Sequence, residues 1–414
     1  MSNGTWETLE REVSKVFTPS APINLRDLFA GRVEQLRQVG DAVNQRGQHA
    51  IIYGERGVGK TSLVNVIVAI FSNNKCLAVR VNAVSSDNYT KLWRKLFSDI
   101  RLTQQVNKIG FQAQSVTKQF SILDEFGVLK DDQIEPDVVR QILTVLSANF
   151  DLILIMDEFD RITSENMKTA IADTIKTLSD NAISATIIVV GVADSVDDLI
   201  KEHYSIERAL VQIQMPRMSP NERYEIIEKG LKHLKMTIEE NAKKYISNLS
   251  QGLPHYIHSL ALHAARVAID KKTKHIVDAH IEIALEKALE GAQQSTKNLY
   301  HKAITSVKKN NIYAQVLLAC SLAKTDSLGY FAAVDVREPL SSIMKKAYSI
   351  ASFSRHLKDF CKEARGPILQ QFGTKHRYRF RFANPLMQPY ITMKGIKDGK
   401  IENLELFPGR MPVS

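Results

Sequence analysis

The sequence predicts an α/β protein in three parts: a core with a doubly wound parallel sheet, an all-helical unit, and a C-terminal winged-helix domain. Near-continuous apolar runs alternate with helix-period segments in the first half of the chain, and strand patterns stop near Met218. Continuous apolar runs are typical of parallel strands covered on both faces. Their alternation with helices indicates a doubly wound sheet.

Five segments are expected to be strands of the core. The three clearest are residues 49–53, 151–156 and 185–190, and two weaker candidates are residues 76–81 and 210–215. Helix-period segments lie between them, at residues 61–71, 89–99 and 165–178. The predicted core is therefore a five-stranded sheet with helices on its faces.

The all-helical unit is predicted to begin at Ser219-Pro220, with serine as N-cap and proline at the first helical position. Its helix patterns lie at residues 220–235, 238–249, 255–268 and 279–289. We expect these segments in order: an N-terminal extension (1–24), the core (25–217), the helical unit (218–292), the winged-helix domain (298–395) and a C-terminal tail (396–414).

The winged helix is predicted from three short helix patterns followed by two alternating strands. The helix patterns lie at residues 312–323, 333–345 and 353–364, and the strands at 367–372 and 378–382. Residues 373–377 join the strands and would form the tip of the wing.

Composition is that of an ordinary folded protein, with 44% hydrophobic and 24% charged residues. Three cysteines without CxxC spacing argue against a disulfide framework and a zinc site. No apolar run approaches the ~20 residues needed to cross a bilayer, so we expect a soluble, cytoplasmic protein. The formal charge is +10, and residues 300–394 hold sixteen Lys/Arg against five Asp/Glu. A basic C-terminal part favours a polyanionic partner, although excess lysine also promotes solubility.

The stretch from Gly54 to Ser62 fits the phosphate-binding loop pattern, because Gly54 and Gly59-Lys60-Thr61 have the required spacing after an apolar strand. Lys60 supplies a positive charge for phosphate oxygens, and Thr61 a hydroxyl ligand for Mg²⁺. The helix that starts near Lys60 directs its positive end at the same anion. The expected phosphate-binding residues are Gly54, Gly57, Gly59, Lys60, Thr61 and Ser62.

A second signal lies at the end of the strand 151–156, where Asp157 and Glu158 follow four aliphatic residues and Met156. Asp157 is expected to hold the water shell of Mg²⁺, and Glu158 to polarise an attacking water. Acidic residues can also simply terminate a strand. Together with the phosphate loop, the pair predicts ATP and Mg²⁺ as cofactors.

The order of Phe29-Ala30-Gly31-Arg32, the phosphate loop, Met156-Asp157-Glu158, a helical lid and a winged helix resembles the AAA+ superfamily. It is most similar to the branch shared by origin-recognition ATPases and STAND signalling ATPases, over residues 25–395. The resemblance implies a P-loop ATPase core, a helical lid and assembly into a homo-oligomer. It also places Phe29 and Arg32 near the adenine.

The resemblance implies two further catalytic residues. Asp194 or Ser195 would stand at the first sensor position, although Asp194 could equally cap the helix expected at residues 195–202. Arg208 would be a finger offered to the nucleotide of a neighbouring subunit, so that an isolated subunit hydrolyses ATP slowly. The alternative for Arg208 is a surface ion pair with Glu207 or Glu202.

Gly252-Leu253-Pro254-His255 in the lid departs from the Gly-Asp-x-Arg pattern of origin-recognition ATPases and resembles the STAND branch. The resemblance implies that Pro254 packs against the nucleotide, and that His255 in place of arginine favours a slow switch. A plain interhelical turn is the alternative.

The winged helix carries the candidate DNA-binding residues. Helical spacing in 353–362 directs Phe353, Leu357 and Phe360 inward and the cations outward. Alternation in 377–382 gives one apolar and one cationic strand face. The candidates are Arg355, Lys358, Lys362, Lys375, Arg377 and Arg379, expected to reach the phosphates of double-stranded DNA. The wing could instead dock on an acidic partner or on its own ATPase face.

We therefore expect an oligomerising ATPase that binds DNA, as in origin recognition, mobile-element targeting or genome defence. The alternative is a nucleotide-dependent signalling switch that recruits a separately encoded effector protein without touching DNA. The early end of the chain after the winged helix favours the first, and Gly252-Leu253-Pro254 favours the second.

Overall fold

The computed structural model describes residues 3–21, 29–73, 75–107, 115–128, 133–193, 196, 199–200, 206–307, 311–374 and 377–401. The chain divides into two compact units. The sheet unit comprises residues 32–54 and 60–215, and the helix-rich unit comprises residues 1–31, 55–59 and 216–414. The division into five segments that the sequence predicts is finer than these two units and stays a prediction.

The sheet unit is built on a five-stranded parallel sheet with the order β2-β5-β6-β1-β7. The strands are β1 (His49–Gly54), β2 (Cys76–Asn82), β5 (Asp151–Asp157), β6 (Ala185–Val192) and β7 (Leu210–Gln214). All five expected strands are present, the two weaker candidates included. The central strands are almost wholly buried, which is why their sequences are continuously apolar.

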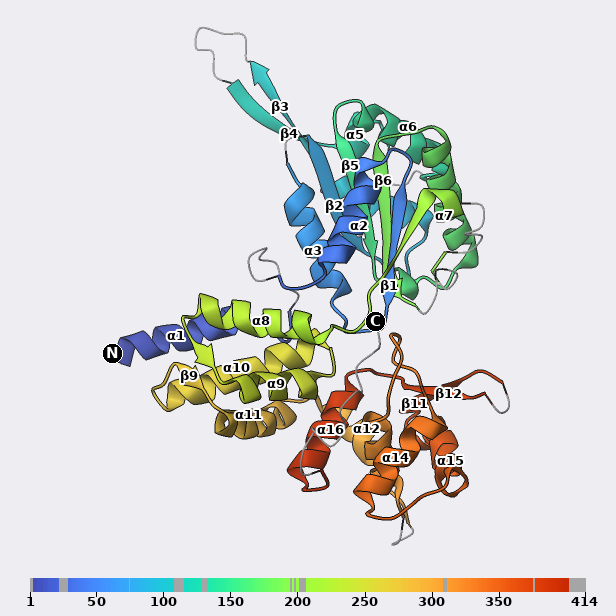
Figure 1. Ribbon diagram of the computed structural model, residues 1–414. Coiled ribbons are helices and arrows are strands. Elements are labelled where there is room, and N and C mark those ends of the chain that lie inside the picture. The colour runs from blue at the N-terminus through green and yellow to red at the C-terminus, as the bar shows by residue number, and fades with distance from the viewer. Residues whose placement is uncertain are drawn as a thin grey trace. The chain divides into compact units, whose positions relative to one another are not determined.

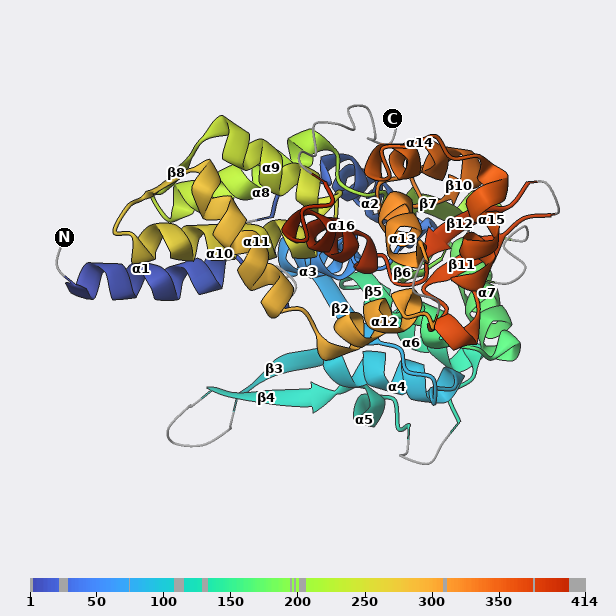
Figure 2. The same ribbon diagram turned by 90° about the horizontal axis from the view of Figure 1, so that it is seen from below.

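Helices cover both faces of this sheet (Figures 1 and 2). One face is covered by α4 (Tyr89–Asp99), α6 (Pro136–Ser147) and α7 (Glu165–Asp180). Apolar residues of these helices, among them the fully buried Trp93 of α4, form one cluster with alternate residues of the strands. On the other face lie α2 (Val33–Asn44) and α3 (Lys60–Phe71). The sheet is thus flanked by helices as expected.

A hairpin after α4 was missed by the sequence patterns. Strands β3 (Arg101–Asn107) and β4 (Ser115–Ser121) pair antiparallel, with Leu102 opposite Phe120, and α5 (Ile122–Glu125) follows. Figure 1 shows the hairpin extending away from the rest of the sheet unit. Its polar, glutamine-rich strands have neither a continuous apolar run nor a regular alternation, which explains the omission.

The helix-rich unit begins with α1 (Asn3–Val16), which packs against α10 (Pro254–Asp270). Phe17 is buried against the ring of His258, with centroids 6.0 Å apart. This unit also contains α8 (Pro220–His233), α9 (Glu240–Ser250) and α11 (Asp278–Glu290), with a short parallel pair of β8 (Thr237–Ile238) and β9 (His275–Ile276). Ser219 and Glu222 cap α8 reciprocally, as the helix start in the sequence indicates.

The C-terminal elements of the helix-rich unit are five helices and a three-stranded antiparallel sheet, β10-β12-β11. They are α12 (Gln294–Ile304), α13 (Tyr313–Ser321), β10 (Phe331–Ala332), α14 (Ala333–Ile343), α15 (Ile350–Asp359), β11 (Leu369–Phe372), β12 (Arg379–Phe382) and α16 (Met387–Lys397).

Two sequence expectations for this region are wrong in detail. The third helix ends at Asp359 rather than near Ala364, because the chain turns into a short 3₁₀ helix (Glu363–Arg365) that ends on Gly366 at φ 75°. The strand pair gains a third member, because Phe331 and Ala332 pair with Phe380 and Arg379. A two-residue strand leaves no periodic pattern in a sequence.

All three cysteines lie in the described part of the chain. Cys76, Cys320 and Cys361 are free thiols, as their scattered spacing indicates. Among the described residues, no helix combines the length and the apolar character that crossing a bilayer requires.

Candidate functional site

The phosphate loop joins β1 to α3 and depends on its glycines. Gly54, Gly57 and Gly59 have φ values of 147°, 87° and 98°, in the region that L-residues rarely adopt. A Cβ on Gly54 would lie 2.4 Å from the carbonyl oxygen of Met215, so that position excludes any side chain. The pattern seen in the sequence therefore has the strand-loop-helix setting that a phosphate cradle needs.

Lys60 is the first residue of α3 and is 8% exposed. Its Nζ donates a hydrogen bond to the carbonyl oxygen of Gly54 at 2.8 Å, so the ammonium lies across the loop. The first turn of α3 contains no acidic residue to offset the positive end of the helix dipole. Charge and dipole thus act together on an anion at the loop. Ser62 follows Thr61 in the same first turn.

Thr61 and Asp157 meet at the carboxyl end of β5, as expected. The Oγ1 of Thr61 donates to Asp157 Oδ2 at 3.2 Å, and the backbone N–H of Glu158 donates to Asp157 Oδ1 at 2.8 Å. A hydroxyl and a carboxylate are the hard oxygen ligands that Mg²⁺ prefers. The described residues contain no group of three or more His, Cys, Asp or Glu that could hold a metal alone. The hydroxyl of Thr61 and the carboxylate of Asp157 fit an ion whose other ligands are phosphates and water.

Arg80 also contacts Asp157 and was missed by the sequence reasoning. Its Nη2 lies 2.9 Å from Asp157 Oδ2, and it donates to Asn82 Oδ1 at 3.0 Å. Arginine is unusual in a segment that otherwise reads as an apolar strand, Cys76-Leu77-Ala78-Val79-Arg80-Val81. That single interruption was the available signal.

Glu158 follows Asp157 in a left-handed backbone conformation, at φ 57°. Such a conformation is uncommon for a residue other than glycine and is typical of functional positions. The carboxylate is 40% exposed and pairs with Arg161, whose Nε lies 3.2 Å from Glu158 Oε2. Asp160 ties the same turn to β6, because its Oδ1 accepts from the N–H of Val192 at 2.8 Å. Glu158 is thus held at the strand end with access to water.

Of the other residues that the resemblance implies for catalysis, the structure describes Arg208 but not Asp194 or Ser195. Arg208 is exposed in a 3₁₀ helix (Glu207–Ala209), and within the described part of the chain its guanidinium forms no ion pair. Its carbonyl oxygen accepts from Gln48 Nε2 at 2.8 Å. Asp194 and Ser195 lie outside the described residues.

The residues expected near the adenine are buried. The carbonyl oxygen of Phe29 accepts from Lys229 Nζ at 2.9 Å. Arg32 is 2% exposed and precedes α2 in a left-handed conformation, at φ 61°. Burial at these positions agrees with a structural role for the segment and leaves its contact with adenine a prediction.

Pro254 lies beside the phosphate loop within the helix-rich unit. It is the first residue of α10, and its Cγ is 3.7 Å from the position of a Cβ on Gly59. Gly252 precedes it at φ 81°, where a Cβ would lie 2.9 Å from the Cβ of Arg217. The turn thus lies against Arg217 and the phosphate loop, and the contact of Pro254 with a nucleotide stays a prediction.

A second ion pair that sequence reasoning missed joins the phosphate loop to the C-terminal elements. Glu55 accepts from Arg217 Nε at 2.7 Å and from Arg217 Nη2 at 2.9 Å, and Arg217 Nη1 donates to Gln388 Oε1 at 2.8 Å. All three side chains are at most 6% exposed. Gln388 lies in α16, and its Nε2 donates to the carbonyl oxygen of Ser321 at 3.1 Å. No periodicity relates residues so far apart in sequence.

The candidate DNA-binding residues in α15 and just after it are exposed but partly paired. Lys362 Nζ lies 2.7 Å from Asp359 Oδ1, and Arg355 Nε lies 3.9 Å from Asp359 Oδ2. Burial acts to raise the pKa of Asp359, yet this pKa is below its ordinary value because Lys362 and Tyr313 donate hydrogen bonds to the carboxylate. Lys358 is exposed between them.

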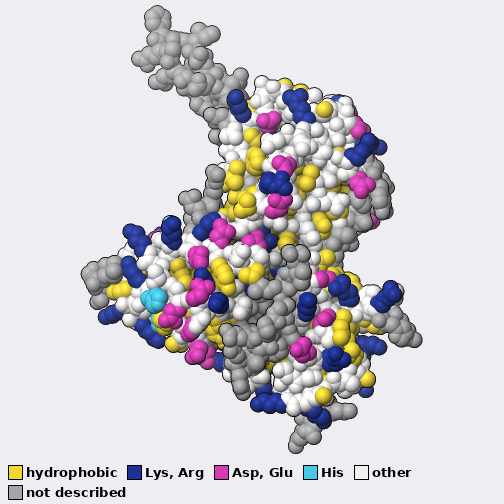
Figure 3. All heavy atoms as spheres, in the orientation of Figure 1, with side chains coloured by type: hydrophobic (Ala, Val, Ile, Leu, Met, Phe, Trp, Pro, Cys, Tyr) yellow, Lys and Arg dark blue, Asp and Glu magenta, His cyan; other side chains and the backbone are white. Residues whose placement is uncertain are grey.

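The strand candidates follow the expected alternation. Phe380 and Phe382 are buried, whereas Arg379 is 52% exposed and pairs with Asp326 at 2.8 Å. Arg377 is exposed, and Lys375 lies outside the described residues. On the face drawn in Figure 3, the C-terminal elements carry several Lys and Arg side chains with acidic ones among them.

Residues 28–190 match the family model of the AAA ATPase domain. This match covers the phosphate loop and the Asp157–Glu158 strand end, so the chain contains an AAA ATPase domain. No protein with curated annotation matches the chain.

Solved structures show a similar fold. A Walker-type ATPase of Pyrococcus abyssi is 14% identical, with 91% of this chain and 99% of that chain covered and a TM-score of 0.51. The ORC2 protein of Aeropyrum pernix, solved as ADPNP–ADP complexes, is 15% identical over 94% of this chain and 98% of that chain, with a TM-score of 0.48. Cdc6p from Pyrobaculum aerophilum is 14% identical over 94% and 99% of the two chains, with a TM-score of 0.45.

Proposed function

We propose that this chain is an ATP-binding, slowly hydrolysing AAA+ ATPase that oligomerises and binds double-stranded DNA through a C-terminal winged helix. The observation that carries the nucleotide assignment is the meeting of Thr61 and Asp157 beside a glycine-rich loop that Lys60 crosses. An anion at this place would meet the loop N–H groups, a buried ammonium and a helix N-terminus.

The residues divide the chemistry between them. Lys60 and the loop would bind the phosphates, and Mg²⁺ held beside Thr61 and Asp157 would neutralise phosphate charge when bound. Glu158 is the residue we assign to orient and deprotonate the attacking water, since its carboxylate is partly exposed at the strand end. For this role, the ion pair between Arg161 and Glu158 would have to break, or leave one carboxylate oxygen free to accept from the water. We assign Asp194 to the first sensor position, beside the γ-phosphate.

Arg208 supports an oligomeric ATPase. Arg208 is exposed and pairs with no carboxylate of the described residues, Glu207 included, while Glu202 lies outside those residues. We assign its guanidinium to the nucleotide of a neighbouring subunit. A finger supplied in this way contributes about 10³ to 10⁵ in rate in other nucleotide hydrolases. The isolated subunit would therefore hydrolyse slowly. Mixing Arg208→Ala subunits with Lys60→Ala subunits tests this, because only an intersubunit finger allows partial recovery of activity.

The C-terminal cations support DNA as the partner. Arg355 and Lys358 lie on α15, Lys362 follows three residues after its end, and Arg377 and Arg379 lie on or beside β12, all of them exposed. If about four cations contact phosphates, the slope of log affinity against log salt is about −3 to −4. The test is a duplex DNA titration at two salt concentrations, with and without ATP. Binding that ignores salt, or no binding at all, would remove DNA from the proposal.

A second candidate is a nucleotide-dependent signalling switch of the STAND type that recruits an effector protein. Two observations favour it: Pro254 packs beside Gly59, and Glu55 of the loop is tied through Arg217 to α16. The pairing of Lys362 and Arg379 with acidic residues also reduces the charge offered to DNA. A nucleotide-dependent change in protease sensitivity without DNA binding would support this second function.

A further inference from the structure

Arg80 provides the positive charge that balances Asp157, the carboxylate assigned to the metal. Arg80 Nη2 lies 2.9 Å from Asp157 Oδ2, the same oxygen that accepts from Thr61 at 3.2 Å. The side chain of Asp157 is 3% exposed. A buried carboxylate is costly without a compensating cation, and Arg80 supplies one.

The register of the sheet explains why Arg80 reaches this place. Arg80 pairs with Ile155 and Asn82 pairs with Asp157 across the parallel β2–β5 ladder. Val81, between them, belongs to the apolar cluster under α4, so Arg80 and Asn82 project to the opposite face of the sheet, which α3 covers. Thr61 and Asn65 lie one turn apart on α3, and Arg80 Nη1 donates to Asn65 Oδ1. The guanidinium is thus held by a carboxylate and two amides.

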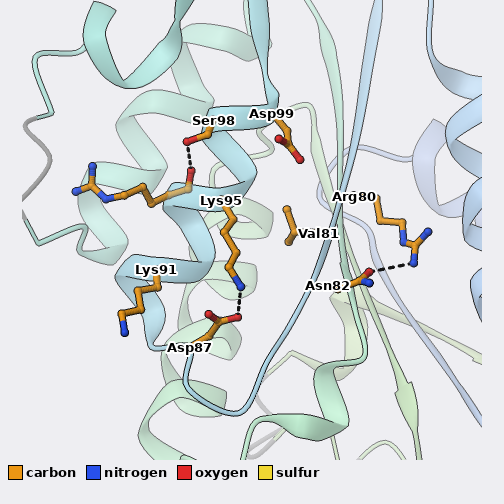
Figure 4. Close-up of a pocket in the computed structure, with 9 residues that line it drawn as sticks. Arg80, Val81, Asn82, Asp87, Lys91, Lys95, Ser98 and Asp99 are labelled. Carbon is orange, nitrogen blue, oxygen red and sulfur yellow. Dashed lines mark hydrogen bonds and ion pairs between the residues drawn. The ribbon is translucent and has the colours of Figure 1, made fainter.

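The position of β2 gives Arg80 a place to move to. β2 is an edge strand, and the side chain of Arg80 is 22% exposed. Arg80 lines a cavity of ≈ 770 Å³ between β2 and α4, together with Asp87, Lys95 and Asp99 (Figure 4). Lys95 already pairs with Asp87 at 2.6 Å. Figure 4 shows the side chain of Arg80 on the opposite side of β2 from Lys95 and Asp99. A guanidinium leaving Asp157 would therefore turn toward solvent at the open edge of the sheet.

We propose that Arg80 takes the place of the metal's charge at Asp157 and is displaced when Mg²⁺ binds with a nucleotide. The inference rests on the proposed nucleotide site and adds a positioning residue to it. A dication a few ångströms from a guanidinium is repelled, and the effective dielectric near a protein surface leaves this repulsion substantial. Part of the metal's interaction with Asp157 is then used to break the Arg80–Asp157 pair. Arg80 therefore weakens the dependence of nucleotide binding on Mg²⁺ and keeps Asp157 in place without the metal.

The test compares Arg80→Gln with the wild-type chain. Glutamine keeps an amide that can bond to Asn82 and removes the charge. ADP is titrated into the full chain once in excess Mg²⁺ and once in EDTA. The affinity in Mg²⁺ divided by the affinity in EDTA measures how strongly the metal promotes nucleotide binding. We expect this ratio to rise about tenfold in Arg80→Gln, as expected for removal of a nearby like charge. Arg140→Gln is the matched control, since Arg140 pairs with Asp137 on the surface of α6. An unchanged or smaller ratio in Arg80→Gln overturns the proposal.

A second measurement does not depend on nucleotide. Without its cation, Asp157 is destabilising, so Mg²⁺ alone should raise the thermal midpoint of Arg80→Gln by several degrees and leave the wild-type midpoint nearly unchanged. Equal responses of the two proteins to Mg²⁺ overturn the proposal. Failure of wild-type ADP binding in both conditions counts against the nucleotide site instead, while this thermal comparison still decides the role of Arg80. If Arg80→Gln does not fold, Arg80→Lys should show a smaller rise of the same ratio, and a fall contradicts the proposal.

Discussion

Glu55 of the phosphate loop and Arg217, just before α8, form a buried ion pair with two hydrogen bonds of 2.7 and 2.9 Å. Arg217 also donates to Gln388 of α16. If the loop rearranges around a phosphate, the movement of Glu55 would therefore shift Arg217 and its hydrogen bond to α16. Buried ion pairs often contribute more to the choice of one conformation than to net stability, which suits a joint between nucleotide and C-terminal elements.

Removing one partner of this pair should be costly. We expect Arg217→Met to lower the free energy of unfolding by about 3–5 kcal/mol, because the Glu55 carboxylate is left buried without a cation. Denaturant unfolding of the full chain measures the change. Lys15→Met is the matched control, since Lys15 pairs with Glu12 on the surface and should change stability by less than about 1 kcal/mol. Equal stabilities for the two variants would contradict the role given to Arg217.

Glu158→Gln should separate binding from hydrolysis. The variant keeps the shape of the side chain but cannot accept a proton from water, so we expect turnover to fall by about 10²-fold or more with little change in nucleotide affinity. Phosphate release and ADP titration measure the two effects. Glu165→Gln, an exposed glutamate at the start of α7, is the control. Normal turnover in Glu158→Gln would assign the water to another residue.

His49 should make the sheet unit sensitive to acid. It is fully buried, and its Nδ1 accepts from the N–H of Ile187 at 2.9 Å. Burial lowers the pKa of His49 to about 3. The unfolded chain binds this proton near pH 6.5 and the folded chain does not, so the stabilising contribution is complete above that pH and is lost as the pH falls toward 3. For one such group the loss between pH 8 and pH 5 is about 2 kcal/mol.

The variant His49→Asn tests this linkage. Its amide oxygen can still accept from Ile187 and does not titrate, so the variant should lose about 2 kcal/mol less stability than the wild type between pH 8 and pH 5. His301→Asn, at an exposed position of α12, should show the wild-type pH dependence. If all three proteins lose the same stability, His49 does not titrate as its burial requires.

The ion pair between Lys362 and Asp359, at the end of α15, predicts which cations contribute more to DNA binding. Lys362 is held by Asp359, whereas Lys358 is exposed and unpaired among the described residues. Lys358→Ala should therefore weaken duplex binding more than Lys362→Ala, and should reduce the salt slope by about 0.9. Binding titrations at several salt concentrations measure both. Lys397→Ala serves as the control, because Lys397 at the end of α16 pairs with Glu286 of α11. Equal losses in all three variants would leave α15 without a special role.

The sheet and its phosphate loop were predictable because their signals are local. Continuous apolar runs indicate strands that are buried on both faces of a sheet. The spacing Gly54-x-x-x-x-Gly59-Lys60-Thr61 is specific to phosphate-binding loops. Thr61 and Asp157 were each assigned to Mg²⁺ from their own motif, and the structure places them within hydrogen-bond distance of each other. The hairpin β3–β4 and the strand β10 could not be predicted in this way, because one is polar and the other has two residues.

Arg80, Arg217 and Gln388 show where sequence reasoning stops. Each acts through a partner far along the chain: Arg80 through Asp157, Arg217 through Glu55, and Gln388 through Arg217. Propensity and periodicity relate residues within one element, so they carry no information on such pairs. An arginine inside an apolar strand is the kind of interruption that points to a partner but does not name it.

The measurement that most directly tests the nucleotide assignment is a calorimetric titration of ATP with Mg²⁺ into the wild-type chain and into Lys60→Ala. Lys60 crosses the loop and contributes the buried charge there. We predict saturable binding of about one nucleotide per wild-type chain and at least a hundredfold weaker binding in the variant, as expected for loss of a buried charge–phosphate contact. No binding to the wild type, or equal binding to both proteins, would contradict the assignment.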